Sequence, residues 1–255
     1  MSHGLYRLRN LEHFDISENK FTGHIDVLLF PALRFVDFSK NKFTTAGFRR
    51  FHKAFYTLQK VNLSSNLISQ DASELFLNIP PTLESFDLSN NDIRGTLPQE
   101  LSMKQLLIFV MSNNSISGPL PDFPDTSPKL KQLVLAKNQL TGTIHDSFFK
   151  LNDLNVLDLT GNELIGGIPA GLGDLTQLNT LKLASNSLSK SIPVKLGRLK
   201  GRWSYRCTCI KCVCVSNINL TRFVSKWYIY FHTVQTCQKH LTCLGTHLLE
   251  PSHQS

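Results

Sequence analysis

Four residues near the carboxyl end of this 255-residue chain have the spacing of a metal-ligand set. Cys209 and Cys212 form one pair with two residues between them, and Cys237 and His240 form a second. Thiolate and imidazole groups paired in this way hold structural zinc in small domains. The segment around them lacks the hydrophobic periodicity and turn signals of such a domain. The sequence therefore predicts no metal site and no cofactor.

Catalytic motifs do not stand out either. No GxGxxG loop precedes a Val-Ala-Ile-Lys stretch, and His-Arg-Asp and Asp-Phe-Gly triplets do not occur, so no kinase domain is encoded here. Aspartates and histidines are present, but they form no spaced acid–base or nucleophile set. The chemistry that the sequence predicts is non-covalent binding, and the chain is not expected to be an enzyme.

The elements that would position binding residues follow from an internal repeat. Eight asparagines recur at intervals of 22 to 25 residues and number the repeats one to eight: Asn19, Asn41, Asn66, Asn91, Asn114, Asn138, Asn162 and Asn186. Self-similarity at such a period is typical of a solenoid, in which each repeat forms one coil and contacts only its neighbours.

Each asparagine has the same apolar frame. The positions eight, five and three residues before it and two residues after it are apolar in all eight repeats, as with Leu154, Leu157, Leu159 and Leu164 around Asn162. Alternation at five and three predicts a short half-buried strand, and stacking predicts a parallel sheet over one continuous core. We expect the asparagine amides to be buried after the strands, where they satisfy backbone groups of their own and neighbouring repeats in a ladder.

The residues after the asparagine predict a turn. Glycine, an apolar residue and proline follow in several repeats, as in 95–98, 118–121 and 166–169. Glycine permits a positive φ and proline fixes the exit from the turn. Thr45 and Gln70 replace the glycine in repeats two and three, which also lack the proline, so we expect an irregular outer edge there.

Together these residues resemble the plant-specific extracellular leucine-rich repeat, LxxLxxLxLxxNxLxGxIP, of receptor-like kinases and receptor-like proteins. The stretch LNVLDLTGNELIGGIPAGLGDL at 154–175 is almost the consensus, and the resemblance covers about residues 8–199. It implies an α/β-type solenoid, a right-handed superhelix with a concave parallel β-sheet and an irregular or 3-10 convex side. It also implies a non-catalytic module on the extracellular side of the plasma membrane, whose partner is a peptide or protein ligand or a co-receptor ectodomain.

Outward positions on the concave strands are the candidate ligand-binding residues. The candidates are Asp87, Leu107, Ile108, Val110, Lys131, Val134, Asp158 and Lys182. The four apolar ones would form an exposed patch in repeats five and six, flanked by charges, and such patches can mark an interaction site. The competing interpretation is a patch covered by long neighbouring side chains, on a face whose aspartates are merely solvated.

Three N-x-[ST] triplets mark candidate glycosylation sites at Asn62, Asn113 and Asn219. Glycosylation at any of them would require export of the chain. The triplets arise often by chance, so they support a secreted origin only slightly.

The composition divides the chain into residues 1–7, an amino-terminal remnant without a cap, the repeats at 8–199, and a non-repeat tail at 200–255. The tail holds all six cysteines and seven basic residues against one acid, so the net charge of +8 lies mostly outside the repeats and does not predict a nucleic-acid partner. Position 210, where the next asparagine is due, is Ile210. We expect a tail that is disordered or that comes from an aberrant gene model.

Neither an export signal nor a membrane span is predicted. The start of the chain has no apolar h-region, and the longest apolar run of the tail, 227–231, is far shorter than the ~20 residues that a span needs. We therefore expect no membrane contact by this chain itself.

The missing caps favour a fragment of a receptor ectodomain. Two alternatives remain open: an inhibitor resembling the cell-wall polygalacturonase inhibitors, which use the same repeat, and a truncated product without function.

Overall fold

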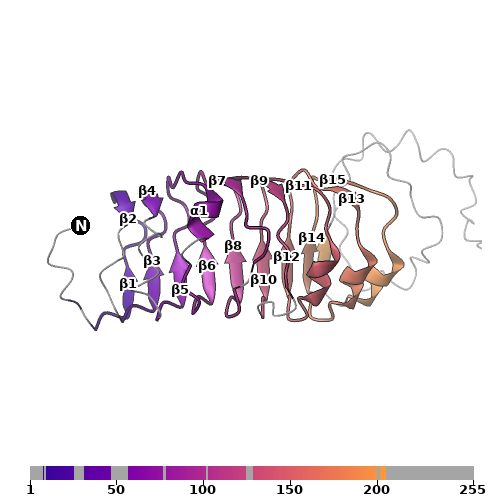
Figure 1. The fold of residues 1–255 in the computed structure, drawn as a ribbon, viewed down its shortest axis with the longest axis horizontal. Coiled ribbons are helices and arrows are strands. Elements are labelled where there is room, and N and C mark those ends of the chain that lie inside the picture. Colours follow the sequence, from indigo (N-terminus) through magenta and orange to yellow (C-terminus); the bar gives the residue numbers. More distant parts are fainter. Residues whose placement is uncertain are drawn as a thin grey trace, which may run out of the picture.

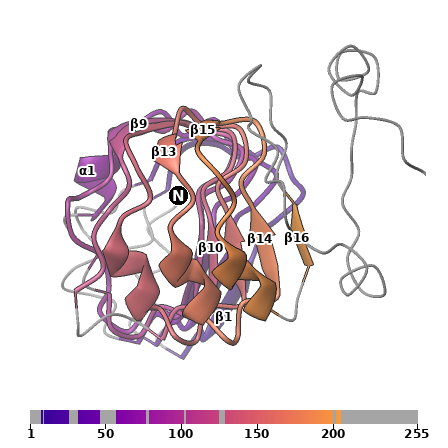
Figure 2. The ribbon, with the colours of Figure 1, turned by 90° about the vertical axis from the view of Figure 1, so that its right-hand side faces the viewer.

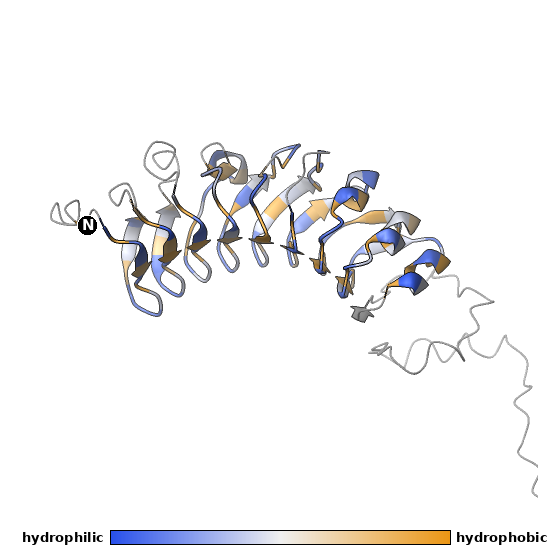
Figure 3. Ribbon diagram, turned by 90° about the horizontal axis from the view of Figure 1, so that it is seen from below, coloured by the Kyte–Doolittle hydropathy of each residue, from blue (hydrophilic) through white to orange (hydrophobic). Residues whose placement is uncertain are grey.

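The predicted solenoid is confirmed in a computed structural model of the chain. The model describes residue 8, residues 10–25, 32–46, 57–76, 79–101, 103–124 and 129–199, and the backbone of residues 202–204. The repeats stack into an elongated arc (Figure 1). Figure 3 shows the same arc from below, with the strands of the main sheet on its inner side and short helices on its outer side.

Nine short strands in the described part of the chain form the concave sheet, in chain order. They are β1 (His13–Asp15), β3 (Phe35–Asp37), β5 (Lys60–Asn62), β6 (Ser85–Asp87), β8 (Ile108–Val110), β10 (Gln132–Val134), β12 (Val156–Asp158), β14 (Thr180–Lys182) and β16 (Arg202–Ser204). All neighbours run parallel, and Val110 pairs with both Asp87 and Val134. Equivalent positions of successive repeats therefore form straight rows across the sheet.

The apolar frame of each repeat forms the core. In repeat six, Leu130, Leu133 and Leu135 are almost fully buried, and the same rows continue through one hydrophobic cluster from Ile25 to Leu199. Removing these side chains from water is the main favourable term for a repeat that cannot bury its apolar face alone.

The asparagines form a ladder of hydrogen bonds between repeats. Asn138 Nδ2 donates to the carbonyl of Met111 in the preceding repeat at 3.0 Å and to the carbonyl of Leu135 at 3.1 Å, while its Oδ1 accepts from the N–H of Ile116 at 3.1 Å. The same two-repeat pattern occurs at Asn41, Asn66, Asn91, Asn114, Asn162 and Asn186. Asn19 is exposed and donates only to carbonyls of its own repeat.

The residue before each asparagine has a left-handed backbone conformation, which the sequence pattern did not predict. The φ angles lie between 53° and 69° at Glu18, Lys40, Ser65, Asn90, Asn113, Lys137, Gly161 and Ser185. Only repeat seven has glycine there, although a non-glycine residue in this region costs about 1 kcal/mol or more. Backbone hydrogen bonds between repeats hold this conformation, since the N–H of Lys137 donates to the carbonyl of Thr160 in the next repeat.

A second set of elements completes each coil away from the concave sheet (Figure 2). Its strands are β2 (Thr22–Ile25), β4 (Lys42–Ala46), β7 (Arg94–Thr96), β9 (Ser115–Pro119), β11 (Gln139–Thr141), β13 (Ile165–Gly167) and β15 (Ser187–Ser189). Its helices are α1 (Ala72–Phe76) and the 3-10 helices η3 (Asp146–Lys150), η4 (Ala170–Asp174) and η5 (Val194–Arg198). In Figure 2, β9, β13 and β15 lie along the upper edge, and α1 lies on the side opposite β16. The glycines of the turn take the positive φ that their position predicted, for instance 79° at Gly118.

Repeats two and three depart from this outer pattern. The pairing of β2 with β4 shifts register between Gly23 and His24, and repeat three has α1 where later repeats have 3-10 turns. Gln70, which stands at the glycine position, accepts a hydrogen bond from the N–H of Ala46 at 2.7 Å through its side-chain oxygen. A side chain thus bridges two repeats where other repeats have a glycine turn.

The sheet continues beyond residue 199, where the sequence repeat ends. The backbone of β16 pairs with β14, with Trp203 opposite Leu181. Residues 205–255, with the zinc-like pairs and Asn219, lie outside the described residues. The nature of that tail stays a prediction.

Candidate ligand-binding surface

The strand position four residues before each asparagine forms one row across the concave sheet. In repeats four to eight this row consists of Asp87, Val110, Val134, Asp158 and Lys182, each paired with the next across adjacent strands. The parallel, in-register pairing places their side chains on the same face of the sheet, about 4.8 Å apart from strand to strand. Five of the eight predicted ligand residues therefore stand in a single line.

The predicted apolar patch lies beside the centre of this row. Ile108 and Val110 belong to β8, Leu107 directly precedes it, and Val134 lies on β10. All four are half-buried, whereas Lys131 is exposed at the start of repeat six. The residues of the patch are thus brought together and remain partly accessible.

The carboxyl-terminal end of the row is an ion pair. Lys182 Nζ lies 3.2 Å from Asp158 Oδ2, and the aspartate side chain is only 12% exposed. Asp158 Oδ1 also accepts a hydrogen bond from the N–H of Thr160. The two predicted ligand residues offset each other's charge, so a ligand would meet this end of the row as a neutral pair.

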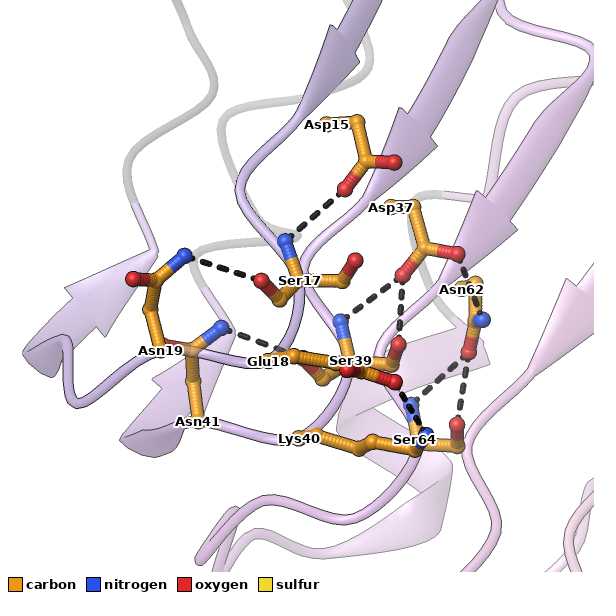
Figure 4. Close-up of polar contacts among 10 residues, drawn as sticks. All are labelled: Asp15, Ser17, Glu18, Asn19, Asp37, Ser39, Lys40, Asn41, Asn62 and Ser64. Carbon is orange, nitrogen blue, oxygen red and sulfur yellow. Dashed lines mark hydrogen bonds and ion pairs between the residues drawn. The ribbon is translucent and has the colours of Figure 1, made fainter.

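Most of the polar residues in the row make the same hydrogen bond, in which a side-chain oxygen accepts from the backbone N–H two residues later. We term this contact the strand cap. The caps are Asp15 on Ser17, Asp37 on Ser39, Asn62 on Ser64, Asp87 on Ser89 and Asp158 on Thr160, at 2.8 to 3.1 Å. Figure 4 shows the first three side by side. These side chains thus satisfy the backbone at the point where each strand ends.

Two of the caps are connected. Asn62 Nδ2 donates to Asp37 Oδ2 at 2.9 Å, and the hydroxyl of Ser39 donates to Asp37 Oδ1 at 2.6 Å (Figure 4). In the first cap, the backbone hydrogen bond from Ser17, followed by that of its hydroxyl, holds the pKa of Asp15 below its ordinary value of 3.8. Hydrogen bonds to the charged form of a carboxyl group favour that form.

A second region of the concave face was missed from the sequence. A shallow hollow of about 300 Å³ lies over repeats one to four, lined by residues of β1, β3, β5 and β6. The His13 ring stacks on Phe35 with centroids 4.3 Å apart, and Lys60 Nζ lies 5.3 Å from the centre of the Phe35 ring. These three residues occupy the position six before the asparagine in repeats one, two and three, so the repeat pattern already placed them on neighbouring strands.

The two described N-x-[ST] sites differ in accessibility. Asn113 is exposed, and its Nδ2 donates to the side chain of Asn90 at 3.0 Å. Asn62 is half-buried on β5 and its amide takes part in the connected caps. A glycan would be accommodated more easily on Asn113 than on Asn62.

The described residues contain neither a metal-ligand cluster nor a membrane-spanning helix. There, His, Cys, Asp and Glu side chains form no group of three or more that could hold a metal ion. No helix in the same part of the chain has both the length and the apolar character needed to cross a bilayer.

Comparison with known protein sequences points to leucine-rich repeats. Two family models described as leucine-rich repeat match residues 128–188 and 82–103. Receptor-like protein 7 of Arabidopsis thaliana is 36% identical over 118 residues, which are 44% of this chain and 12% of that protein. The brassinosteroid LRR receptor kinase of Solanum lycopersicum is 35% identical over 125 residues, which are 46% and 10%. The chain thus spans less than a fifth of the length of these relatives.

Solved structures share the fold over most of the described chain. The plant peptide hormone receptor RGFR1 in complex with RGF2 has a TM-score of 0.73 at 32% identity, covering 78% of this chain and 32% of that one. The LRR ectodomain of the membrane receptor kinase GASSHO1/SCHENGEN3 from Arabidopsis thaliana, in complex with CASPARIAN STRIP INTEGRITY FACTOR 2, has a TM-score of 0.72 at 32% identity, covering 79% and 24%. The chain is therefore a leucine-rich-repeat solenoid of the type found in plant receptor-like ectodomains.

Proposed function

We propose that the chain is part of the ligand-recognition ectodomain of a plant cell-surface receptor and binds an extended peptide or protein segment on its concave sheet. The proposal places it on the extracellular side of the plasma membrane, with a co-receptor ectodomain as a second partner. Binding is non-covalent, and the chain itself performs no catalysis.

The observation that carries the proposal is the row of outward side chains across the parallel concave sheet, all of them at least partly accessible except the buried Asp158. At about 4.8 Å per strand, the sheet is on the order of 40 Å long. An extended peptide advances roughly 3.3 Å per residue, so about 12 residues would span it. The two structural neighbours named above were solved as complexes, and one of them is a peptide hormone receptor, which supports a binding role for this fold.

The ladder makes this surface suitable for binding. Each asparagine fixes the end of its strand through contacts to two repeats, so the outward side chains keep one spacing before a ligand arrives. A surface that is already ordered loses less conformational entropy on binding than a flexible one.

The test is selection of random 12-residue peptides displayed on phage against the purified full chain. We expect enriched peptides that bind in isothermal titration and that lose binding when Ile108 on the concave sheet is replaced by arginine. The matched control is Val194→Arg on η5, since Val194 is 79% exposed on the outer side. Failure to enrich any peptide, or equal loss of binding in the outer-side variant, would contradict the proposal.

A further inference from the structure

Repeats five and six differ from their neighbours because their strand caps are missing. The cap positions hold Val110 and Val134, which have no oxygen to accept the N–H groups of Ser112 and Ala136. Among the described residues, neither N–H donates a hydrogen bond to backbone or side chain. The four preceding repeats and repeat seven all have the cap.

The backbone ladder explains why these N–H groups have no substitute acceptor. Around Ser112, the N–H of Met111 donates to the carbonyl of Val134 and the N–H of Asn113 donates to that of Ala136, both in the next repeat. The N–H of Ser112 lies between them and is not used by this ladder. In capped repeats the equivalent N–H is met by a side chain of the concave row, so it is directed to the concave face.

The surroundings restrict what could meet these donors. Ala136 is only 9% exposed, so an N–H without an acceptor at this position is costly. Half-buried Val134 lies two residues before it and pairs with Val110 on β8, and half-buried Ile108 and Leu107 lie towards the start of β8. A ligand that offers an oxygen to the N–H groups and an apolar group to these side chains would satisfy both features at once.

Charge favours a neutral oxygen over a carboxylate. Asp87 pairs with Val110 on the adjacent strand and has no basic ion-pair partner among the described residues, whereas Asp158 on the other side is neutralised by Lys182. An anionic ligand group would approach the Asp87 carboxylate. The two N–H groups also lie on adjacent strands, about 4.8 Å apart, which is wider than the separation of the two oxygens of one carboxylate.

We propose that a bound peptide completes the missing caps: its backbone carbonyl oxygens accept hydrogen bonds from the N–H groups of Ser112 and Ala136 while an apolar side chain packs on Leu107, Ile108, Val110 and Val134. The inference rests on the proposed function and deepens it, since it names the site on the concave face and the chemistry of the segment that binds there. Repeat eight also lacks a cap, since Lys182 stands at its cap position, but it has a charged residue in place of the apolar patch.

The test restores the caps from within the chain. In the double variant Val110→Asp and Val134→Asp, the new carboxylates accept the N–H groups as Asp37 does in repeat two. Because the new carboxylates stand between Asp87 and Asp158, where like charges repel, we expect the restored caps to leave the midpoint of urea unfolding nearly unchanged. We also expect at least a tenfold loss of affinity for the 12-residue peptides enriched on the unaltered chain. Stability and binding would then change independently, which a merely structural role of the valines does not predict.

Two controls separate the contributions. Gln132→Glu adds a negative charge on β10 without reaching the N–H groups, and should lower affinity less than threefold for uncharged peptides. Val134→Ala keeps the N–H groups free and shortens the apolar contact, so a moderate loss is expected. In addition, the amide NMR signals of Ser112 and Ala136 should shift downfield when an enriched peptide is added.

The outcomes distinguish the two proposals. Enriched peptides that bind the double aspartate variant as tightly as the unaltered chain would overturn the cap-completion site while leaving concave binding in place. A loss of equal size with Gln132→Glu would show a charge effect and would likewise overturn it. Absence of any enriched peptide would overturn both proposals.

Discussion

The concave face has two regions built on one backbone frame. Repeats one to four have polar cap residues, Asp15, Asp37, Asn62 and Asp87, each bound to the N–H two residues later. Repeats five and six have valines at the same positions and leave the N–H groups without an acceptor among the described residues. From Asn41 onward, the asparagine ladder passes through both regions unchanged.

This difference shows how a solenoid separates stability from recognition. The ladder and the core satisfy what every repeat requires, so the outward row can vary without loss of the fold. The capped region uses its polar side chains on its own backbone, while the uncapped region leaves donors and apolar surface for a partner. The polar half of the face thus has less hydrogen-bonding capacity to spare than its composition suggests.

The largest expected effect is on the frame that both regions share. Asn138→Ala removes three donated hydrogen bonds and one accepted one at an 8% exposed site between repeats five and six. Buried backbone groups left without partners make the change destabilising by about 3 kcal/mol or more. Asn19→Ala, at an exposed ladder position, should cost less than about 1 kcal/mol. Urea unfolding followed by circular dichroism measures both, and equal losses would show that the ladder does not carry the stability.

The next effect tests the capped region. Asp37→Ala removes the acceptor of the Ser39 N–H and hydroxyl and of Asn62 Nδ2, and should cost about 1–2 kcal/mol. Val110→Ala, at the same position in an uncapped repeat, removes only two half-buried methyl groups, so it should cost roughly 1 kcal/mol or less. If the valine variant were the more destabilised of the two, the valines would be structural and the comparison would fail.

The frame could be predicted from the sequence because it is periodic. Four apolar columns and one asparagine column fix the strands, their register and the core, and each column has a steric or hydrogen-bonding requirement of its own. The patch of Leu107, Ile108, Val110 and Val134 followed from the same register. Contacts between side chains of different repeats did not, because they depend on which residues become neighbours after stacking.

Three features show that limit. The ion pair of Asp158 with Lys182 joins residues 24 positions apart that the column pattern treats as separate candidates. The stacked His13 and Phe35 lie in the same column as the predicted Ile108, but in repeats where no candidate was named. The left-handed residue before each asparagine has no constant residue type. Its conformation is set by backbone hydrogen bonds between repeats, so it could not be predicted from the residue type at that position.

A smaller effect is expected at the outer turn of repeat eight. Lys190 has a φ of 65° at the position where Gly95, Gly118, Gly142 and Gly166 stand in repeats four to seven. Glycine adopts this conformation without the Cβ penalty, which exceeds its entropic cost in the unfolded chain. Lys190→Gly should therefore raise the free energy of unfolding by roughly 0.5–1 kcal/mol. The matched change Lys195→Gly, within η5, should be destabilising instead, and a gain of stability there would refute the conformational explanation.

The smallest effect concerns the charge of a cap. Because the pKa of Asp15 is lowered in the folded chain by the Ser17 hydrogen bonds, its carboxylate contributes stability above the ordinary pKa of 3.8. That contribution is lost as the pH falls below this value through the lowered pKa. Asp15→Asn keeps a side-chain oxygen to accept the Ser17 N–H, as Asn62 does for Ser64, but does not titrate. Urea midpoints should therefore be similar at pH 7, while the variant loses slightly less stability than the unaltered chain between pH 4 and pH 2.5. Identical pH profiles would show that the first cap is formed equally well by the protonated acid, and that its charge contributes nothing to the capped region.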